Sequence, residues 1–586
     1  MKRVRLAVIG FASAVLLGCG GSGNDGTPSA GEATPPASPG GTDQAAAPPP
    51  VTCAASSASL VKGTITVNGT AREYFESAPA AILPLREKDA RGIAVVVNFH
   101  DVNQTGQSGA ASTCWNEVGE AKGAVTVFPS ALGGAWNTKG AAGATDEVAF
   151  LKALLPVIKT KYALASNAIV YYTGVGQGGK MAQSMAMQAP QFLAAVASID
   201  GTAEPEVFAL ASDKLPPTTM SSWIIKTKTQ ADPSEATQIA YWNKQNSTST
   251  SSTLTVVDDP TFASRVYASD ARPLQQVKVS TSKLSGYAGK ALTENIWENL
   301  FAKTVRFFDD NRTNGTIHAN QTIEDMKLID TTKQLVSGSP RRWLTYLPSN
   351  YAALTAGGKK IPLVISHHGR NGSGRWQAIT SQWHEVGEKY GFIVVYPQGT
   401  GATWNTSIAP TNVDVAFELA LIDELKTQYA VDPTRVYLNG ASMGSAFTNR
   451  MAVQYPLLFA AIAPCYSGHL SPANYADPIV RTDVPMPTWQ CRGQDEVPSD
   501  FPGGTAGEAA AQVFWRETVN KNSGVPTLQV DGRRVTEIWN NGVAEYRWQL
   551  TQYQPHFWNE GQAAKIWEEM FSKYSRAANG QLVRLP

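Results

Sequence analysis

The chain has almost no net charge and few of the residues that bind metals or form disulfides. Its 586 residues include 49 Lys and Arg against 48 Asp and Glu, together with 7 histidines and 5 cysteines. This balance does not provide the basic face that nucleic-acid binding requires, so we expect no nucleic-acid partner. The adjacent pair His367 and His368 lacks the spacing of two ligands on one face, and the sequence therefore predicts no metal site.

Long apolar runs are scarce too, and the first run, at residues 6–17, is too short to span a membrane comfortably. It follows the basic stretch Met1–Arg5 and ends in Leu-Leu-Gly-Cys19, which resembles the processing signal of bacterial lipoproteins. The resemblance implies removal of residues 1–18, lipidation of Cys19 and export. The membrane would then be contacted only through this anchor, at the outer membrane or cell surface. An ordinary secretory signal is the alternative.

Residues 19–50 are rich in Gly, Ala, Pro, Ser and Thr and nearly free of aromatic residues. Such a composition cannot bury enough apolar surface to fold, so the sequence predicts a flexible tether here. Globular composition begins near Val51.

The globular part repeats itself at a nearly constant offset. The stretch Val95-Val-Val-Asn-Phe-His100 recurs as Leu363-Val-Ile-Ser-His-His368, an offset of 268 residues from His100 to His368. Trp136-Asn-Thr recurs as Trp404-Asn-Thr, again 268 residues later, and Ile296-Trp-Glu recurs as Ile566-Trp-Glu, 270 residues later. This constancy predicts a duplicated domain, with copies at residues 51–312 and 313–586.

Short continuous apolar runs alternate with helical patterns in each copy. In the second copy the runs are Leu363–Ser366, Phe392–Tyr396, Arg435–Leu438, Ala460–Pro464 and Thr488–Cys491. Buried strands separated by helices indicate a parallel sheet that is covered on both faces. The sequence therefore predicts an α/β fold, with two tandem domains that each contain a mostly parallel, doubly wound sheet.

One stretch of the second copy has the pattern of a catalytic turn. The apolar run Val436–Leu438 ends at Asn439-Gly440, and Gly440-Ala-Ser442-Met-Gly444 leads into a helical pattern. A strand, a sharp turn and a helix give the G-x-S-x-G motif its mechanism, because the serine hydroxyl then projects from the apex. The two glycines allow other backbones to pass closely on either side of the turn.

The second copy resembles α/β-hydrolases of the polyhydroxybutyrate-depolymerase and feruloyl-esterase type, over about residues 327–574. The matching stretches are His368-Gly369, Tyr396-Pro397, Trp404-Asn405, Val413-Asp-Val-Ala-Phe417, Val431-Asp432, Gly440-Ala-Ser-Met-Gly444 and Phe459-Ala-Ala-Ile-Ala463. Arg370 and Ser445 stand where such esterases often have Cys and Gly. The resemblance implies ester hydrolysis without a cofactor.

A serine nucleophile needs a base, and the base needs an orienting acid. In α/β-hydrolases these follow in the order Ser, acid, His. His556 precedes the final helical pattern and is the predicted base, since His469 comes too early for that order. Asp495 directly follows a strand-like run and is the predicted acid. The alternatives for the acid are Glu496 and Asp500.

Other residues are candidates for holding the substrate. The oxyanion needs two N–H donors, for which we predict Met443 and Arg370. His368, Trp404 and Trp558 fall in segments expected near the catalytic face, where flat rings stack on sugar or aromatic groups. Core packing is the alternative for Trp404, because its counterpart Trp136 is present in the first copy.

The first copy lacks the predicted chemical groups. Gly176 stands where Ser442 stands, Thr229 aligns with the acid and Gly286 aligns with the base. This copy is predicted to keep the fold without the mechanism. A structural brace, a substrate-binding surface and a remnant of duplication remain open as its role.

The cysteines that follow Cys19 are distributed two and two between the copies: Cys53 and Cys114 in the first, Cys465 and Cys491 in the second. Export would place them in an oxidising compartment. We therefore predict the disulfides Cys53–Cys114 and Cys465–Cys491, with buried free thiols as the alternative.

Taken together, the sequence predicts a lipid-anchored serine carboxylesterase, with a polymeric ester among its candidate substrates. The candidate substrates are short polyesters, hydroxyalkanoate oligomers, and feruloyl or acetyl esters on polysaccharide. A serine peptidase on the same fold and a non-catalytic binding lipoprotein are the rival hypotheses.

Overall fold

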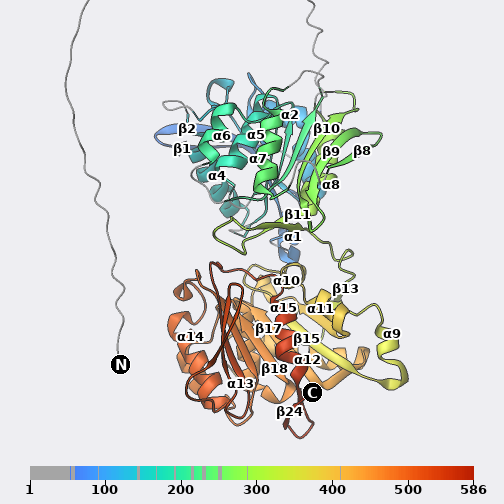
Figure 1. Ribbon diagram of the computed structural model, residues 1–586, viewed down its shortest axis with the longest axis vertical. Coiled ribbons are helices and arrows are strands. Elements are labelled where there is room, and N and C mark those ends of the chain that lie inside the picture. Colours follow the sequence, from blue (N-terminus) through green and yellow to red (C-terminus); the bar gives the residue numbers. More distant parts are fainter. Residues whose placement is uncertain are drawn as a thin grey trace, which may run out of the picture. The chain divides into compact units, whose positions relative to one another are not determined.

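The computed structural model describes residues 53, 60–89, 91–140, 145–165, 168–190, 193–212, 217–227, 232–248, 254–286, 288–409 and 411–586. The predicted signal peptide, Cys19 and the tether lie outside these ranges. All of the described residues belong to one compact unit. It contains two large sheets, and we call the parts built around them the first lobe and the second lobe (Figure 1).

The first lobe is built on a ten-stranded sheet. Its strands, in spatial order, are β1 (Val61–Val67), β2 (Thr70–Ser77), β4 (Val125–Pro129), β3 (Val95–Phe99), β5 (Val170–Val175), β6 (Leu193–Ile199), β7 (Ser221–Lys226), β10 (Arg272–Ser282), β9 (Phe262–Ser269) and β8 (Leu254–Asp258). Neighbouring strands from β4 to β10 are parallel, and both edges are antiparallel.

The second lobe has a ten-stranded sheet with the same order. Its strands are β13 (Ile329–Lys333), β14 (Arg341–Tyr346), β16 (Ile393–Pro397), β15 (Ile361–His367), β17 (Val431–Ala441), β18 (Ala461–Cys465), β19 (Thr488–Gly493), β22 (Tyr546–Thr551), β21 (Arg534–Trp539) and β20 (Thr527–Asp531). The stretch from β16 to β22 is parallel. Two mostly parallel sheets confirm the predicted α/β class.

Helices cover the sheets in both lobes (Figure 1). In the first lobe they are α1 (Ile82–Asp89), α2 (Gly106–Thr113), α3 (Trp115–Lys122), α4 (Glu147–Lys161), α5 (Gln177–Gln188), α6 (Pro205–Ser212), α7 (Glu235–Gln245) and α8 (Lys290–Asn299). In the second lobe they are α9 (Tyr351–Leu354), α10 (Gly374–Ser381), α11 (Trp383–Tyr390), α12 (Val413–Gln428), α13 (Met443–Gln454), α14 (Gly504–Val513) and α15 (Gln562–Glu569).

In the second lobe, alternate side chains of a strand pack on opposite faces of the sheet, so the core has two layers. Val364 of β15 packs in the cluster that includes Trp383 of α11 and Trp567 of α15. Its neighbour Leu363 packs in a second cluster, which includes Leu421 of α12. Successive side chains of a strand point to opposite faces, so a strand that is apolar throughout requires cover on both. This is why the continuous apolar runs of the sequence indicate buried strands.

A small hairpin crosses the boundary predicted at residues 312 and 313. Strand β11 (Thr304–Phe307) pairs with β12 (Thr316–Ala319), and the second lobe ends with a similar hairpin of β23 (Tyr574–Arg576) and β24 (Leu582–Arg584). By this correspondence the first lobe extends to Ala319, a few residues beyond the predicted boundary.

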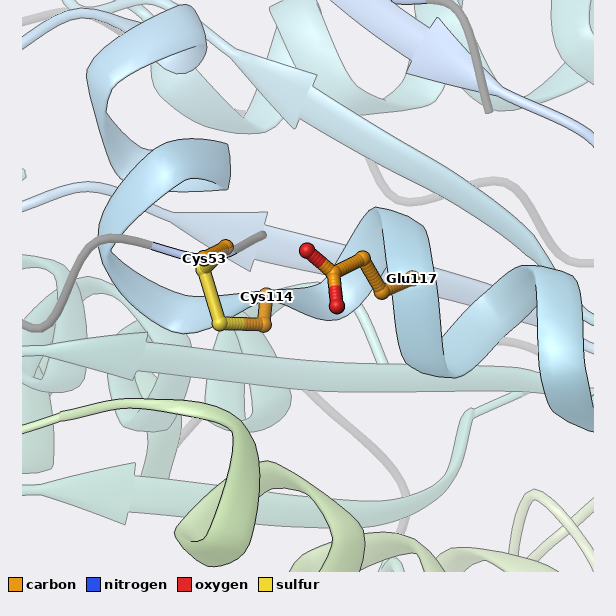
Figure 2. A group of neighbouring side chains, drawn as sticks. All are labelled: Cys53, Cys114 and Glu117. Atoms are coloured by element: carbon orange, nitrogen blue, oxygen red, sulfur yellow. A yellow bond between two sulfur atoms is a disulfide. The ribbon is translucent and has the colours of Figure 1, made fainter. Parts of the chain in front are cut away.

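The structure confirms both predicted disulfides. Cys53 and Cys114 are bonded with Cα atoms 5.4 Å apart, and Cys465 and Cys491 with Cα atoms 4.5 Å apart. Figure 2 shows the first bond with the carboxylate of Glu117 beside it. These three side chains are close enough for a metal site, but sulfurs in a disulfide are not the thiolates that bind zinc. The second bond joins β18 to β19 where Cys465 and Cys491 are paired.

Candidate active site

Ser442 occupies the sharp turn between β17 and α13, as the sequence predicts. Its backbone has φ 58° and ψ −119°, a left-handed conformation that is rare for a residue with a side chain. The turn is held from behind, because the Ser442 N–H donates to the carbonyls of Cys465 and Tyr466, both at 3.1 Å. A strained residue that its surroundings fix in this way is typical of functional sites.

The two glycines of the motif are required by close backbone approach. A Cβ at Gly440 would overlap the carbonyl group of Gly444, and a Cβ at Gly444 would overlap the carbonyl oxygen of His367. The helix can therefore begin directly against β15 and β17. Its first residue, Met443, has an N–H without an intrahelical partner, as every helix N-terminus does.

His556 lies in the segment between β22 and α15, and its partner is a buried carboxylate. The distance from His556 Nδ1 to Glu496 Oε2 is 2.8 Å, and the Glu496 side chain is fully buried. Glu496 Oε1 accepts the Gly493 N–H at 2.6 Å, which fixes the carboxylate. The ring of Phe501 stacks on the imidazole, with centroids 3.8 Å apart. This pairing places the ring proton on Nδ1 and leaves Nε2 as a base.

The carboxylate bonded to His556 belongs to Glu496, the predicted alternative, and not to its neighbour Asp495, the predicted acid. Asp495 is exposed, and its Oδ2 accepts a hydrogen bond from Asn311 Nδ2 at 2.8 Å. The chain turns directly after β19, because the Glu496 N–H donates back to the Gly493 carbonyl. This turn directs the side chain of Glu496 inward, whereas that of Asp495 points toward Asn311. The other alternative, Asp500, is also exposed.

Ser442 and His556 line one cavity of about 190 Å³. Met443, Arg370 and Phe501 line it as well. Gly369, which precedes Arg370, lies beside Ser442: a Cβ there would be 3.8 Å from Ser442 Oγ. The loop after β15 is thus placed where a second oxyanion donor is needed, and the roles of the Met443 and Arg370 N–H groups stay predictions.

His368 and Trp404 have structural roles instead of the predicted contact with substrate. His368 is 1% exposed, and burial lowers its pKa to about 4. Its Nδ1 bonds the Gly369 carbonyl at 2.7 Å, and its Nε2 accepts the Gly399 N–H at 3.0 Å. Trp404 is buried and donates from Nε1 to the His368 carbonyl at 2.8 Å. Neither ring has a face free for a ligand.

The first lobe shows the same arrangement, which supports this conclusion. Trp136 Nε1 donates to the His100 carbonyl at 2.8 Å, and His100 Nε2 accepts the Ala131 N–H at 2.9 Å. The same hydrogen bonds thus hold the corresponding loop in both lobes, with and without a serine at the turn. The third predicted contact, Trp558, is 4% exposed and packs against Tyr466, so the structure places it in the core as well.

The first lobe has the same sharp turn with glycine in place of serine. Gly176 has φ 57° and ψ −119°, close to the values at Ser442. A Cβ at Gly176 would overlap the carboxylate of Asp101, and Asp101 Oδ1 accepts the Gln177 N–H at 2.8 Å. Gln177 corresponds to Met443, whose N–H is a predicted oxyanion donor. In the first lobe, the Asp101 carboxylate therefore binds the N–H that would correspond to this donor. Gly286 supplies no base, and Thr229 lies outside the described residues.

This geometry gives a first prediction, for the variant Gly176→Ser. Its hydroxyl would meet the Asp101 carboxylate and have no base, so we expect no hydrolytic activity from the first lobe. Overpacking of this kind costs about 1–3 kcal/mol, and the free energy of unfolding should fall accordingly. The check is chemical denaturation together with fluorophosphonate labelling in a Ser442→Ala background. Labelling at residue 176 would contradict it.

One further group of described side chains has the spacing of a cation site. Ligand atoms of Asp309, His318 and Glu560 lie within 4.8 Å of one another. Thr316 bonds both Asp309 Oδ2 and His318 Nε2, and Arg272 pairs with Glu560 at 2.9 Å. Asp309 Oδ1 is buried and has no hydrogen-bond partner among the described residues. Arg272 thereby supplies the positive charge that a cation would bring to Glu560.

Comparisons with known proteins match parts of this chain. The family model described as Esterase PHB depolymerase matches residues 343–479, which include Ser442 but end before Glu496 and His556. A bifunctional acetylxylan esterase/xylanase of Neocallimastix patriciarum is 34% identical over 161 residues, covering 27% of this chain and 22% of that protein. A probable acetylxylan esterase A of Aspergillus fumigatus is 34% identical over 130 residues, covering 21% of this chain and 33% of that protein.

The chain thus spans between about a fifth and a third of the length of these two relatives. Among solved structures, an acetyl xylan esterase from Aspergillus awamori aligns with 42% of this chain and 98% of its own, at 18% identity and a TM-score of 0.34.

Proposed function

We propose that the second lobe is a serine carboxylesterase that forms an acyl-enzyme on Ser442 and uses no cofactor. The observation that carries this proposal is the joint placement of its groups. Ser442 and His556 line one small cavity, and a buried Glu496 is bonded to Nδ1 of His556. A nucleophile, a base and an orienting acid are the set that acyl transfer requires.

In the proposed reaction, Ser442 Oγ attacks the ester carbonyl while His556 Nε2 takes the hydroxyl proton. Glu496 stabilises the imidazolium that forms. The Met443 N–H and a donor from the loop at Arg370 bind the oxyanion, each such donor being worth about 10²–10³ in rate. His556 then gives its proton to the leaving alcohol. A water molecule, activated by the same histidine, releases the acid and restores Ser442.

The comparisons support esters over amides as substrates. The matching family model is named for an esterase, and the two relatives described above are named as acetylxylan esterases. Candidate substrates are therefore acetyl or feruloyl esters on polysaccharide and short polyesters such as hydroxyalkanoate oligomers. The rival hypotheses are a serine peptidase with the same groups and a binding protein without catalysis.

A substrate panel tests the reaction class. We expect the purified protein to hydrolyse p-nitrophenyl acetate or butyrate, or feruloyl esters, and to leave peptide amides intact. Cleavage of amides with no cleavage of esters would favour the peptidase. No turnover of either class would favour the binding protein.

We further propose export and lipid anchoring at Cys19, which rests on the sequence of residues 1–19. No helix in the described part of the chain is both long and apolar enough to cross a membrane. We expect Cys19→Ala to shift the protein from the membrane fraction to the soluble fraction, with loss of the lipid mass. Unchanged fractionation and unchanged mass would reject the anchor.

A further inference from the structure

The first lobe reaches the catalytic cavity of the second lobe through the end of α1. Asp89, the last residue of this helix, accepts hydrogen bonds from Ser373 Oγ at 2.8 Å and from Arg375 Nη1 at 2.9 Å. Both donors belong to the segment where α10 begins. Arg91 follows and donates from Nη2 to the carbonyl oxygen of Arg370 at 3.2 Å. These contacts hold Arg91 against the loop that lies beside the nucleophile.

Arg91 lines the same cavity as Ser442 and His556. Burial lowers its pKa to about 10, so its guanidinium is charged at neutral pH. Its Nε is buried and has no hydrogen-bond partner among the described residues. Asp89 is the neighbouring acid, yet its two oxygens are engaged by Ser373 and Arg375. Arg91 as a whole is half-buried, and its buried Nε can still donate a hydrogen bond to an anion.

One acid and a second cation also line the cavity. Asp500 and Arg370 both line it, and both are exposed. Water screens exposed charges of this kind, and these two are of opposite sign. The least exposed charged side chain that lines the cavity is therefore the half-buried cation Arg91.

We propose that Arg91 of the first lobe binds a carboxylate of the ester substrate, so that the enzyme prefers short hydroxy-acid oligomers with a free acid end. This inference rests on the proposed esterase function. A guanidinium is a planar fork whose N–H groups match the two oxygens of a carboxylate. In such an oligomer the acid end belongs to the leaving alcohol, which must lie beside Ser442 when the ester bond is cleaved.

The proposal also gives the first lobe a role. It has lost its own nucleophile, but α1 and Arg91 would complete the binding site of the other lobe. The role is thus a substrate-binding surface, one of the three that the sequence leaves open.

The test compares two forms of one substrate. The 3-hydroxybutyrate dimer has a free carboxylate, and the same dimer capped as a carboxamide is neutral and has the same ester bond. We expect the full chain to have a higher kcat/KM for the acid. Arg91→Ala should lower the ratio of the two kcat/KM values at least about tenfold, mostly through KM of the acid, because one charge-assisted contact is lost.

Two further variants keep the test interpretable. Arg91→Lys retains the charge without the fork, so we expect an intermediate ratio, and it serves should Arg91→Ala fail to fold. Lys88→Ala removes an exposed cation from α1, three residues before Arg91. We expect it to leave the ratio of the two kcat/KM values within about twofold.

An unchanged ratio in both Arg91 variants, or no preference for the acid in the original chain, would overturn the inference while the esterase function stands. Absence of turnover with both dimers and with p-nitrophenyl esters would instead reject the function, and the inference with it.

Discussion

Replacing Ser442 with alanine is expected to lower kcat for ester hydrolysis by about 10⁴- to 10⁶-fold, as removal of a triad nucleophile typically does. The variant keeps the oxyanion donors and the cavity, so a small residual rate over water should remain. Binding should persist, because the change removes one hydroxyl and no wall of the cavity. The measurement is the initial rate on p-nitrophenyl esters, with KM and kcat determined separately.

The control for this variant is its stability. Alanine keeps a Cβ on the left-handed backbone of residue 442, so it adds no strain that serine lacks. The loss of one small polar group should change the free energy of unfolding by less than about 1 kcal/mol. Retention of more than a tenth of the original kcat in a folded Ser442→Ala protein would exclude Ser442 as the nucleophile.

The second large effect is expected at Glu496. Glu496→Gln keeps the size of the side chain but presents an amide to His556, which can hold the ring in the wrong tautomer. The corresponding Asp→Asn change in a serine protease lowers kcat by about 10⁴, and we expect a loss of about 10³- to 10⁴-fold here.

Asp495→Asn is the matched comparison for Glu496→Gln. It makes the same chemical change one residue away, on a carboxylate that bonds Asn311 and does not contact His556. We expect its kcat to stay within about threefold of the original. Equal losses of kcat in the two variants, or a larger loss in Asp495→Asn, would contradict Glu496 as the acid that orients His556.

The sequence predicts most of what is local. Ser442 is found because a strand, two glycines and a helix are adjacent in the chain, and each constrains the next. The paired lobes follow from the repeat offset, and the disulfides from the distribution of four cysteines between the copies. The α/β class follows from apolar runs whose alternate residues, such as Leu363 and Val364, pack on opposite faces.

The orientation of a side chain after a strand is harder to predict. Asp495 and Glu496 are adjacent acids, and the turn that closes from Glu496 to Gly493 determines which of them points to His556. Neither the composition of the sequence nor the order of its residues predicts that turn. The same limit applies to His368 and Trp404. Their segments are expected near the catalytic face, but hydrogen bonds hold both rings inside the loop.

Arg91 illustrates a different limit. It precedes Arg370 by 279 residues and belongs to the copy that lacks the catalytic groups. No periodicity or motif joins the two positions, because their contact depends on how α1 packs against the second lobe. The contacts of Asp89 with Ser373 and Arg375, and the bond from Arg91 to the Arg370 carbonyl, place it at the cavity.

The central claim is that Ser442 is the one activated serine and that His556 and Glu496 activate it. The most direct measurement is labelling of the full chain with a fluorophosphonate probe, followed by peptide mass mapping. We expect a single modified residue, Ser442, rapid labelling of the original chain, and slow or no labelling of His556→Ala and Glu496→Gln. Labelling at another residue, or equally fast labelling of the His556→Ala variant, would contradict the proposed site.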